Sequence, residues 1–437
     1  YYDIGTNFSV QLLTIERTSD MIPEFSLEYI DGTPYLVPYG QAVSCGAKAV
    51  KLNSTGAVMW QKLCDAVNSC TGDIRFNPMS DNLRNIWLDL LYNYFEADNT
   101  SNKSIIADDA DTFIRTLDIN HVFNAFMFNN TINIDSITKN FSIAGLSMSY
   151  NGPSRMYPDE FDSFMIKDNS KCSINISVAG SLSRNYPLEE LVIETRDVCI
   201  FKKTDGYFIL FNIFSVIKEC ELFDDGRVNL FYNVPSLKDS GKCIHGVLND
   251  IDYQTGTYEV FHAIRFAYLF FNQKRGIYAL HSASILYRDR LWLISAPSGT
   301  GKSTHADIWN RIYDTPVING DLNCIDISGT QLIVKGTPWC GTSGIYDSNT
   351  YKLGGIILIS QGKDNVITPA DKMDNVILSV ANRFISPSWT KEMLKSNITA
   401  ARAICDKALV FSYSCSMSDN AAVICREYID NYIDNID

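Results

Sequence analysis

The sequence of 437 residues contains no apolar run long enough to cross a bilayer, and no basic segment followed by an apolar core at its start. It also lacks any C-x-x-C pair, because its 12 cysteines are scattered along the chain. Scattered cysteines in a large chain are usually small buried groups, so neither a zinc site nor a disulfide framework is expected. These absences predict a protein that stays in the cytoplasm and does not contact a membrane.

Positive charge is scarce as well. The chain has 37 Lys and Arg against 50 Asp and Glu, a net charge of −13. Proteins that bind DNA or RNA neutralise phosphates with clustered Lys and Arg, so a nucleic-acid partner is not expected. Hydrophobic residues make up 46% of the chain, which is ample for sizeable cores, and the length predicts roughly two to four domains.

The strongest chemical signal lies in LWLISAPSGTGKSTHADIWNRIYDTPVINGD, residues 291–321. Its apolar start at 291–295 predicts a strand, 296–301 is small and flexible, and 302–312 has helical spacing of apolar residues. In such a turn the free backbone N–H groups point into one concavity, which suits phosphate oxygens. We therefore expect a nucleotide-binding loop here, although an ordinary strand-to-helix turn is the simpler alternative.

The expected phosphate contacts are Ser298, Gly299, Thr300, Gly301, Lys302, Ser303 and Thr304. Among them, Lys302 supplies a positive charge for the outer phosphates and Ser303 a hydroxyl for Mg²⁺. The full G-x-x-x-x-G-K-[ST] pattern fails at its first position, Ala296. The prediction therefore depends on the neighbouring strand and helix rather than on the motif.

Asp321 is expected to face the same crevice as Lys302. A helix of about 12 residues returns the chain across roughly 18 Å, and a short β-prone segment then ends at Asn319-Gly320-Asp321. Parallel strands joined by a helix end at the same edge of a sheet, where ligands bind. A carboxylate there can hold Mg²⁺ or accept a proton from a hydroxyl, but it can also be a plain turn residue.

His281 precedes a predicted hairpin of residues 282–287 and 290–295. Its spacing leaves a structural and a functional role equally open. A long helix is predicted over 257–278, and His262 on it is expected to be structural. Two further cations, Lys352 and Arg383, are candidates for a second positive charge on a transferring phosphate.

Three segments, LHSASILYRDRLWLISAPSGTGKSTHADIW, VINGD and VKGTPWCG, resemble the nucleotide-binding domain of the HPr kinase and phosphoenolpyruvate carboxykinase group. The resemblance is strongest to HPr kinase-like proteins that accompany ribosomally made, modified peptides, and it extends from about residue 142 to the C-terminus. It implies ATP or a similar nucleotide, Mg²⁺, and phosphoryl transfer to a peptide hydroxyl.

Site residues follow from this resemblance position by position. His281 matches the family's histidine beside the transferred phosphate, and Lys302 and Ser303 match its phosphate and metal groups. Asp321 matches the second of its paired aspartates, whereas Gly320 stands in the place of the first. This departure is compatible with a divergent kinase and with a nucleotide binder that has lost turnover.

Residues 1–125 predict a small winged helix, with strands near 28–38 and 47–52 and helices near 53–67, 81–95 and 107–117. The segments KAVKLNSTGAVMWQKL and DDADTFIRTLDINHV resemble the PqqD-like peptide-recognition domain. That resemblance implies that the leader of a precursor peptide adds a strand to an exposed sheet edge. The expected contacts are the strand from Tyr29 to Val37 and the neighbouring helix.

The sequence thus predicts an α+β multidomain protein: the PqqD-like winged helix, a linker near 126–140, a mostly β region at 141–257 and an α/β HPr kinase-like P-loop domain at 258–437. The expected function is ATP-dependent phosphorylation of a Ser or Thr in a leader-bound precursor peptide, with His281, Lys302 and Asp321 as catalytic residues. The alternatives are a nucleotide-binding leader-peptide scaffold without phosphoryl transfer and, less favoured, a carboxykinase. The nucleobase, the acceptor and a homo-oligomeric state stay open.

Overall fold

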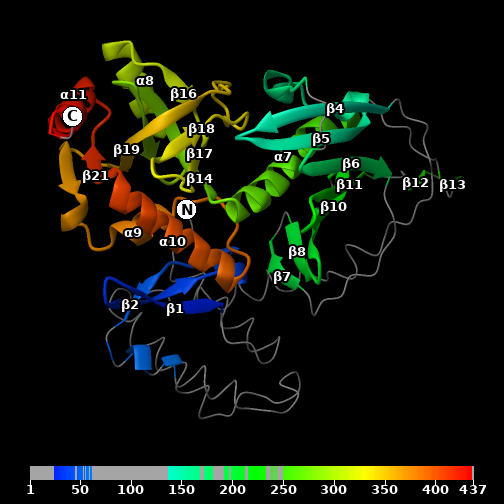
Figure 1. The fold of residues 1–437 in the computed structure, drawn as a ribbon, viewed down its shortest axis with the longest axis horizontal. Helices are drawn as coiled ribbons and strands as arrows, with labels where there is room; N and C mark the ends of the chain where they lie inside the picture. The colour runs from blue at the N-terminus through cyan, green and yellow to red at the C-terminus, as the bar shows by residue number, and fades with distance from the viewer. Residues whose placement is uncertain are drawn as a thin grey trace.

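The structure, a computed structural model, describes residues 24–61, 136–167, 172–180, 191–195, 198–211, 215–232, 238–243 and 250–435, apart from 45–46, 53, 55, 59 and 240–241. These residues form a three-stranded sheet, two eight-stranded sheets and a two-stranded ladder, joined by helices (Figure 1). The α+β class predicted from the sequence is confirmed. Within the described ranges no helix is long and apolar enough to span a bilayer.

The N-terminal sheet contains β1 (Phe25–Ile30), β2 (Thr33–Pro38) and β3 (Val50–Lys51) in that order, and the short helix α2 (Gly40–Ser44) lies between β2 and β3 in the chain. Asp31 and Gly32, which join β1 to β2, have φ angles of 50° and 77°. Two residues in this conformation match the twist of a two-residue hairpin. The chain is helical at the described positions of 54–61, whereas the helices predicted at 81–95 and 107–117 lie outside the described residues.

The middle sheet has the strand order β4-β5-β6-β11-β10-β9-β8-β7. Its strands are β4 (Ser136–Ile143), β5 (Leu146–Pro153), β6 (Ile174–Gly180), β7 (Leu191–Glu194), β8 (Val198–Lys203), β9 (Gly206–Phe211), β10 (Ile217–Phe223) and β11 (Arg227–Tyr232). The short 3-10 helices η2 (Ser154–Met156) and η3 (Asp159–Phe164) follow β5, and β12 (Lys238–Asp239) pairs with β13 (Lys242–Cys243). Strand β4 starts at Ser136, so the sheet begins inside the segment expected to be a linker. Buried and more exposed side chains alternate at the end of this strand, where Phe141 and Ile143 are completely buried.

Helix α7 (Asp250–Lys274) runs between the two large sheets (Figure 1). Its buried side chains, including Val260 and Ile264, share one core with the middle sheet and with Leu322 of the C-terminal sheet. The helix begins and ends earlier than the predicted 257–278. It ends early because Gly276, with a φ of 76°, stops the helix and β14 starts at the next residue.

The C-terminal sheet has the strand order β15-β14-β17-β18-β19-β21-β20, with β16 beside β14. Its strands are β14 (Ile277–Tyr287), β15 (Arg290–Ser295), β16 (Val317–Asn319), β17 (Leu322–Asp326), β18 (Ile333–Lys335), β19 (Thr350–Gln361), β20 (Val366–Pro369) and β21 (Leu409–Cys415). A further pairing of β15 with β19 closes β14, β15, β19, β18 and β17 into a ring. The predicted hairpin is therefore part of a curved sheet.

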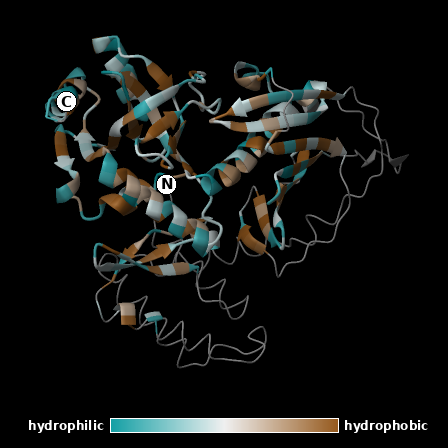
Figure 2. Ribbon diagram, in the orientation of Figure 1, coloured by the Kyte–Doolittle hydropathy of each residue, from teal (hydrophilic) through white to brown (hydrophobic). Residues whose placement is uncertain are grey.

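Both faces of this sheet are covered. Its helices are α8 (Lys302–Tyr313), α9 (Val376–Ala381), α10 (Lys391–Lys407) and α11 (Asp419–Ile433), with the short 3-10 helix η5 (Ala370–Lys372) after β20. Along β15, Trp292 and Ile294 pack with α8 and α11, whereas Leu291 and Leu293 pack with α9 and α10. A strand buried on both faces is mostly apolar, and brown segments run along the strands of this sheet in Figure 2.

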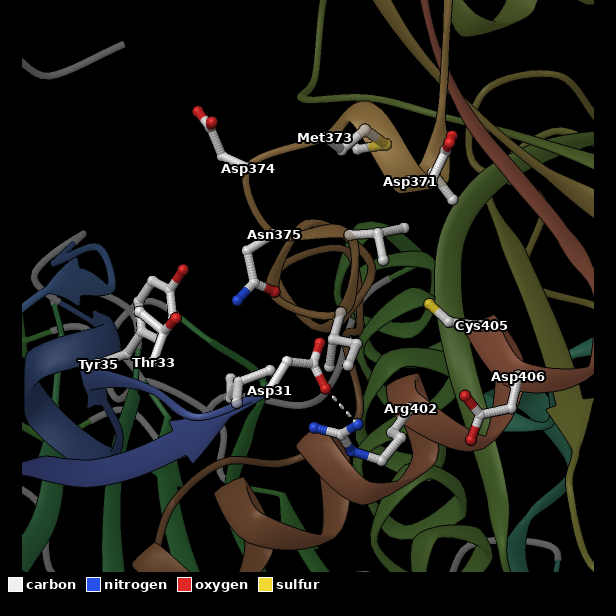
Figure 3. A pocket seen from close by; sticks show the side chains of 14 residues that line it. Asp31, Thr33, Tyr35, Asp371, Met373, Asp374, Asn375, Arg402, Cys405 and Asp406 are labelled. Atoms are coloured by element: carbon white, nitrogen blue, oxygen red, sulfur yellow. Dashed lines mark hydrogen bonds and ion pairs between the residues drawn. The ribbon is translucent and has the colours of Figure 1, made fainter.

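The N-terminal sheet is docked on the rest of the protein. Ile30 and Tyr35 belong to the same hydrophobic core as α9 and α10, and Arg402 of α10 forms an ion pair of 2.8 Å with Asp31. A cavity of about 370 Å³ lies at this seam, between the β1–β2 turn, α9 and α10 (Figure 3). On the other side, the side-chain amide of Gln41 bonds both the N–H and the C=O of Glu194 on β7, at 2.5 and 2.7 Å.

Candidate functional site

The glycine-rich loop joins β15 to α8 at one edge of the C-terminal sheet. The preceding hairpin turns through Arg288 and Asp289, whose φ angles are both positive, at 48° and 57°. The loop itself depends on two glycines, since Gly299 has a φ of 74° and Gly301, the N-cap of α8, has a φ of 111°. A Cβ atom added at Gly299 would meet no atom within 4 Å, so this side of the loop is open.

The first turn of α8 presents the expected phosphate and metal contacts. The first N–H groups of a helix have no partner within it and attract anions. Ser303 and Thr304 are exposed on this turn, whereas Lys302 is buried and its Nζ donates to the carbonyl of Ala296 at 3.4 Å. Burial lowers the pKa of Lys302, partly offset by the negative charge of Asp321. The lysine is thus held against the loop, and its ammonium group interacts electrostatically with Asp321.

Asp321 reaches the same edge, as the sequence predicted. Both β15 and β16 pair antiparallel with β14, so they run in the same direction and end on the same side of the sheet. Asn319 shapes the turn after β16, because its buried Oδ1 accepts from the N–H groups of Asp321 and Leu322 at 2.8 and 3.0 Å. In the sequence Asn319 is only part of a turn, and its role as the internal acceptor is seen in the structure.

His281 and Asp321 form a close pair. The Nε2 atom of His281 lies 3.1 Å from Oδ1 of Asp321, and both side chains are about three-quarters buried. His281 is in the middle of β14 rather than at its start, opposite Leu322 on β17. The hydrogen bond from His281 is the main cause that lowers the pKa of Asp321, against the effect of burial and with help from Arg265 and Lys302. The carboxyl group is therefore ionised at neutral pH.

Arg265, on α7, is a further residue of the site, which no motif in the sequence indicated. Its Nη2 lies 3.7 Å from Oδ2 of Asp321. The signal that could have found it is a single arginine inside the apolar stretch HAIRFAYLFF. His262, one turn earlier, was expected to be structural, but its pKa is lowered by burial and by Arg265 and raised by Asp321, so it also lies near the site.

A second loop, residues 340–344, packs against Gly320 and Asp321. A Cβ atom at Gly320 would lie 2.3 Å from Oγ of Ser343, so only glycine fits there. Gly341 has a φ of 63°, and a Cβ on it would lie 3.0 Å from the Cβ of Asp321. The resemblance implies an aspartate at position 320. In this chain Ser343 fills the space that a side chain at that position would need. Trp339, which precedes the loop, is buried and donates to the carbonyl of Phe261 at 3.2 Å, so it packs rather than stacks on a ligand.

The two remaining candidate cations differ in position. The carbonyl of Arg383 accepts from the N–H of His281 at 2.9 Å, and the charge of Arg383 contributes to lowering the pKa of Lys302. Arg383 therefore belongs to the site. Lys352 pairs with Arg290 at the start of β15, the end opposite to the glycine loop. The prediction that Lys352 lies near the transferring phosphate is wrong, because the sequence does not show the register in which β19 pairs with β15.

The donor set fits a nucleotide-bound Mg²⁺ better than a metal held by protein alone. Within the part of the chain that the structure describes, no group of three or more His, Cys, Asp and Glu could hold a metal ion. Mg²⁺ in phosphoryl-transfer sites is usually held by one or two protein groups together with phosphate oxygens. The exposed hydroxyl of Ser303 and the carboxylate of Asp321 are oxygen ligands of the kind that such a site uses.

The fold and site define a mixed α/β domain in which a glycine-rich loop faces a histidine–aspartate pair. No protein-family model matches the chain, and no curated protein matches it. Among solved structures, the structure of the Hpr(Ser) kinase/phosphatase from Coxiella burnetii is similar to 36% of this chain and 97% of its own, at 10% sequence identity and a TM-score of 0.23. A TM-score this low does not establish a shared fold, so the chemistry has to be inferred from the residues of this chain.

Proposed function

We propose that this protein binds ATP with Mg²⁺ and transfers a phosphoryl group to a Ser or Thr hydroxyl of a peptide. The observation that carries the proposal is the convergence of the glycine loop, Lys302 and the His281–Asp321 pair at one edge of the sheet. Phosphoryl transfer needs mainly positioning and charge stabilisation. The glycine loop at the start of α8, a buried lysine and an ionised carboxylate supply both.

Different residues of the chain would bind the phosphates, hold the metal ion and accept the proton. The loop from Ser298 to Gly301 and the first turn of α8 bind the phosphates, with Lys302 against the outer ones. Ser303 and Asp321 would hold Mg²⁺, which neutralises charge on the phosphates when it is bound. His281, hydrogen-bonded to Asp321, orients that carboxylate, and either group can accept the proton of the acceptor hydroxyl.

The N-terminal sheet is proposed to capture the leader of a precursor peptide. Among the strands that the structure describes, β1 lies at an edge of this sheet, and the side chain of Tyr29 on that strand is 63% exposed. An edge strand can accept a peptide strand through main-chain hydrogen bonds. The sheet is fixed to α10 through the Asp31–Arg402 ion pair, so a captured leader would be tethered to the domain that carries the glycine loop. Tethering raises the local concentration of the acceptor segment.

Intact mass of a precursor peptide tests this function. The protein is incubated with Mg²⁺, ATP and the peptide encoded beside its gene, and the peptide should gain the mass of one phosphoryl group. Lys302→Met and Asp321→Asn should abolish the gain while the peptide still binds. An unmodified peptide with the wild-type protein, under conditions where ATP and the leader both bind, would refute phosphoryl transfer.

That refuting result would favour the second candidate, a nucleotide-binding scaffold that presents the leader-bound peptide to a separate enzyme. The observation in favour of the scaffold is Gly320, because loop 340–344 occupies the place of a second carboxylate. A site with a single carboxylate can bind nucleotide without turning it over. A carboxykinase is less favoured, because an enzyme that acts on a small acid would not need a leader-binding sheet.

A further inference from the structure

The two carboxylate oxygens of Asp321 contact side chains from two different elements, strand β14 and helix α7. Oδ1 lies 3.1 Å from His281 of β14, and Oδ2 lies 3.7 Å from Arg265 of α7. The contact with Arg265 is longer than a hydrogen bond, so it is an ion pair that leaves lone pairs of Oδ2 available to another ligand. Asp321 is thus oriented without being saturated.

Orientation matters because the terminal torsion of an aspartate is broad. With His281 as its sole partner, the carboxylate could turn about its Cβ–Cγ bond and move Oδ2 away from the sheet edge. A positive charge on the second oxygen opposes that rotation. Since both Asp321 and Arg265 are about three-quarters buried, their attraction is screened less than at the surface.

Arg265 can act in this way only if α7 is rigid. Its neighbours Ala263 and Ile264 are completely buried in the core shared by the middle and C-terminal sheets. One turn earlier, the carbonyl of Phe261 accepts the indole N–H of Trp339, which leads into loop 340–344. At its end, Gln273 donates to the carbonyl of Pro387 at 2.8 Å and to the side chain of Asn397. The helix is therefore fixed along most of its length.

We propose that Arg265 is a positioning residue, which holds the Oδ2 side of Asp321 so that the carboxylate presents its free lone pairs to a nucleotide-bound Mg²⁺. This inference rests on the proposed function, since it assumes that Asp321 faces Mg²⁺ and a nucleotide. It adds a residue that the sequence did not indicate, from a helix outside the strand–loop–helix unit. It also assigns α7 the task of aligning the carboxylate. The charged and titratable groups facing Asp321 are His281, Arg265, His262, Lys302 and Cys340.

Binding of ADP with and without Mg²⁺, measured by calorimetry on the full chain, tests the proposal without requiring turnover. In Arg265→Gln the affinity gained by adding Mg²⁺ should fall by about 10- to 100-fold, as it does when an outer-shell partner of a metal ligand is removed. The metal-free affinity for ADP should stay unchanged. Arg265→Lys, which keeps the charge, should recover part of the loss.

Arg275→Gln is the matched control. This arginine follows the end of α7 and donates to Asn272 and to the carbonyl of Gly145, each at 2.9 Å. It lies about 15 Å along the helix from Arg265. Its variant should bind ADP like the wild type with and without Mg²⁺. Thermal unfolding of each variant shows whether the chain is folded at the temperature of the titration.

A double-mutant cycle with Asp321→Asn decides whether Arg265 acts through Asp321. If it does, adding Arg265→Gln to Asp321→Asn causes no further loss of the Mg²⁺-dependent affinity. A full Mg²⁺-dependent gain in Arg265→Gln, or an equal further loss in the Asp321→Asn background, would overturn the positioning role alone. Failure of the wild type to bind ADP at all would overturn the proposed function together with this inference.

Discussion

His281 and Asp321 are 40 positions apart in the sequence, yet Nε2 of His281 lies 3.1 Å from Oδ1 of Asp321. Strand pairing brings them together, because His281 on β14 is opposite Leu322 on β17 and the N–H of Ser282 bonds the carbonyl of Asp321 at 2.9 Å. The backbone ladder therefore sets how closely the two residues approach, and their side chains meet beside it.

Lys302→Met should reduce phosphoryl transfer by at least about a hundredfold, because it removes a charge aimed at the outer phosphates. Stability should change little, since the lysine makes one long hydrogen bond to Ala296, at 3.4 Å, and a Met side chain keeps its apolar stem. Phosphorylated peptide is counted by mass, and unfolding is followed by circular dichroism. Lys352→Met, at the other end of the sheet, should behave like the wild type, and an equal loss there would contradict the placement of the site.

Gly320→Ala should destabilise the protein by about 1–3 kcal/mol, because its methyl group would overlap Ser343, with 2.3 Å between the added Cβ and Oγ. Denaturant unfolding measures the loss. Adding Ser343→Gly should recover part of it, but not all, because the carbonyl of Cys340 lies 2.9 Å from the same point. Full stability of the single variant would mean that loop 340–344 does not fill this space.

Gln41→Ala should loosen the contact between the N-terminal sheet and the middle sheet. The variant loses two hydrogen bonds to the backbone of Glu194 and exposes the edge of β7. Amide hydrogen exchange at Glu194 should speed up, and stability should fall by about 1–3 kcal/mol. Ser44→Ala is the control on the same helix, since its hydroxyl bonds the carbonyl of Gly40, at 3.4 Å. Unchanged exchange in Gln41→Ala would contradict a direct role of the amide.

Glu24 should make stability depend on pH. Burial raises its pKa to about 7, although the N–H groups of Gln41 and Ala42 bond its carboxyl group and act in the opposite direction. Since the unfolded-state pKa is lower, its contribution to stability is fully present below a pH of about 4.5 and is lost as pH rises through about 7.

Glu24→Gln, which stays neutral, tests that dependence. Its stability relative to the wild type should increase as pH rises from about 4.5 to about 7 and then level off. Denaturant unfolding at a series of pH values provides the comparison. A constant difference between the two proteins across this range would show that folding does not raise the pKa of Glu24.

Local patterns in the sequence determined the strand, loop and helix of 291–312 and the hairpin before them. The glycines at 299 and 301 adopt the left-handed conformations that such a loop requires, and Arg288-Asp289 forms the turn between the predicted strands. These features are decided within a few residues by backbone sterics and by the spacing of apolar side chains. For the same reason the sequence could place Lys302 and Asp321 at one sheet edge.

Only the tertiary structure decided which distant groups join them. Arg265 approaches Asp321 from a helix 56 positions away in the sequence, and Lys352 is kept away from the loop by the register of β19 against β15. Ser343 fills the space beside Gly320 because a separate loop folds over it. Such contacts depend on how sheets and helices pack, and no local pattern encodes that packing, because a side chain's distant neighbours are chosen by the burial of the whole core.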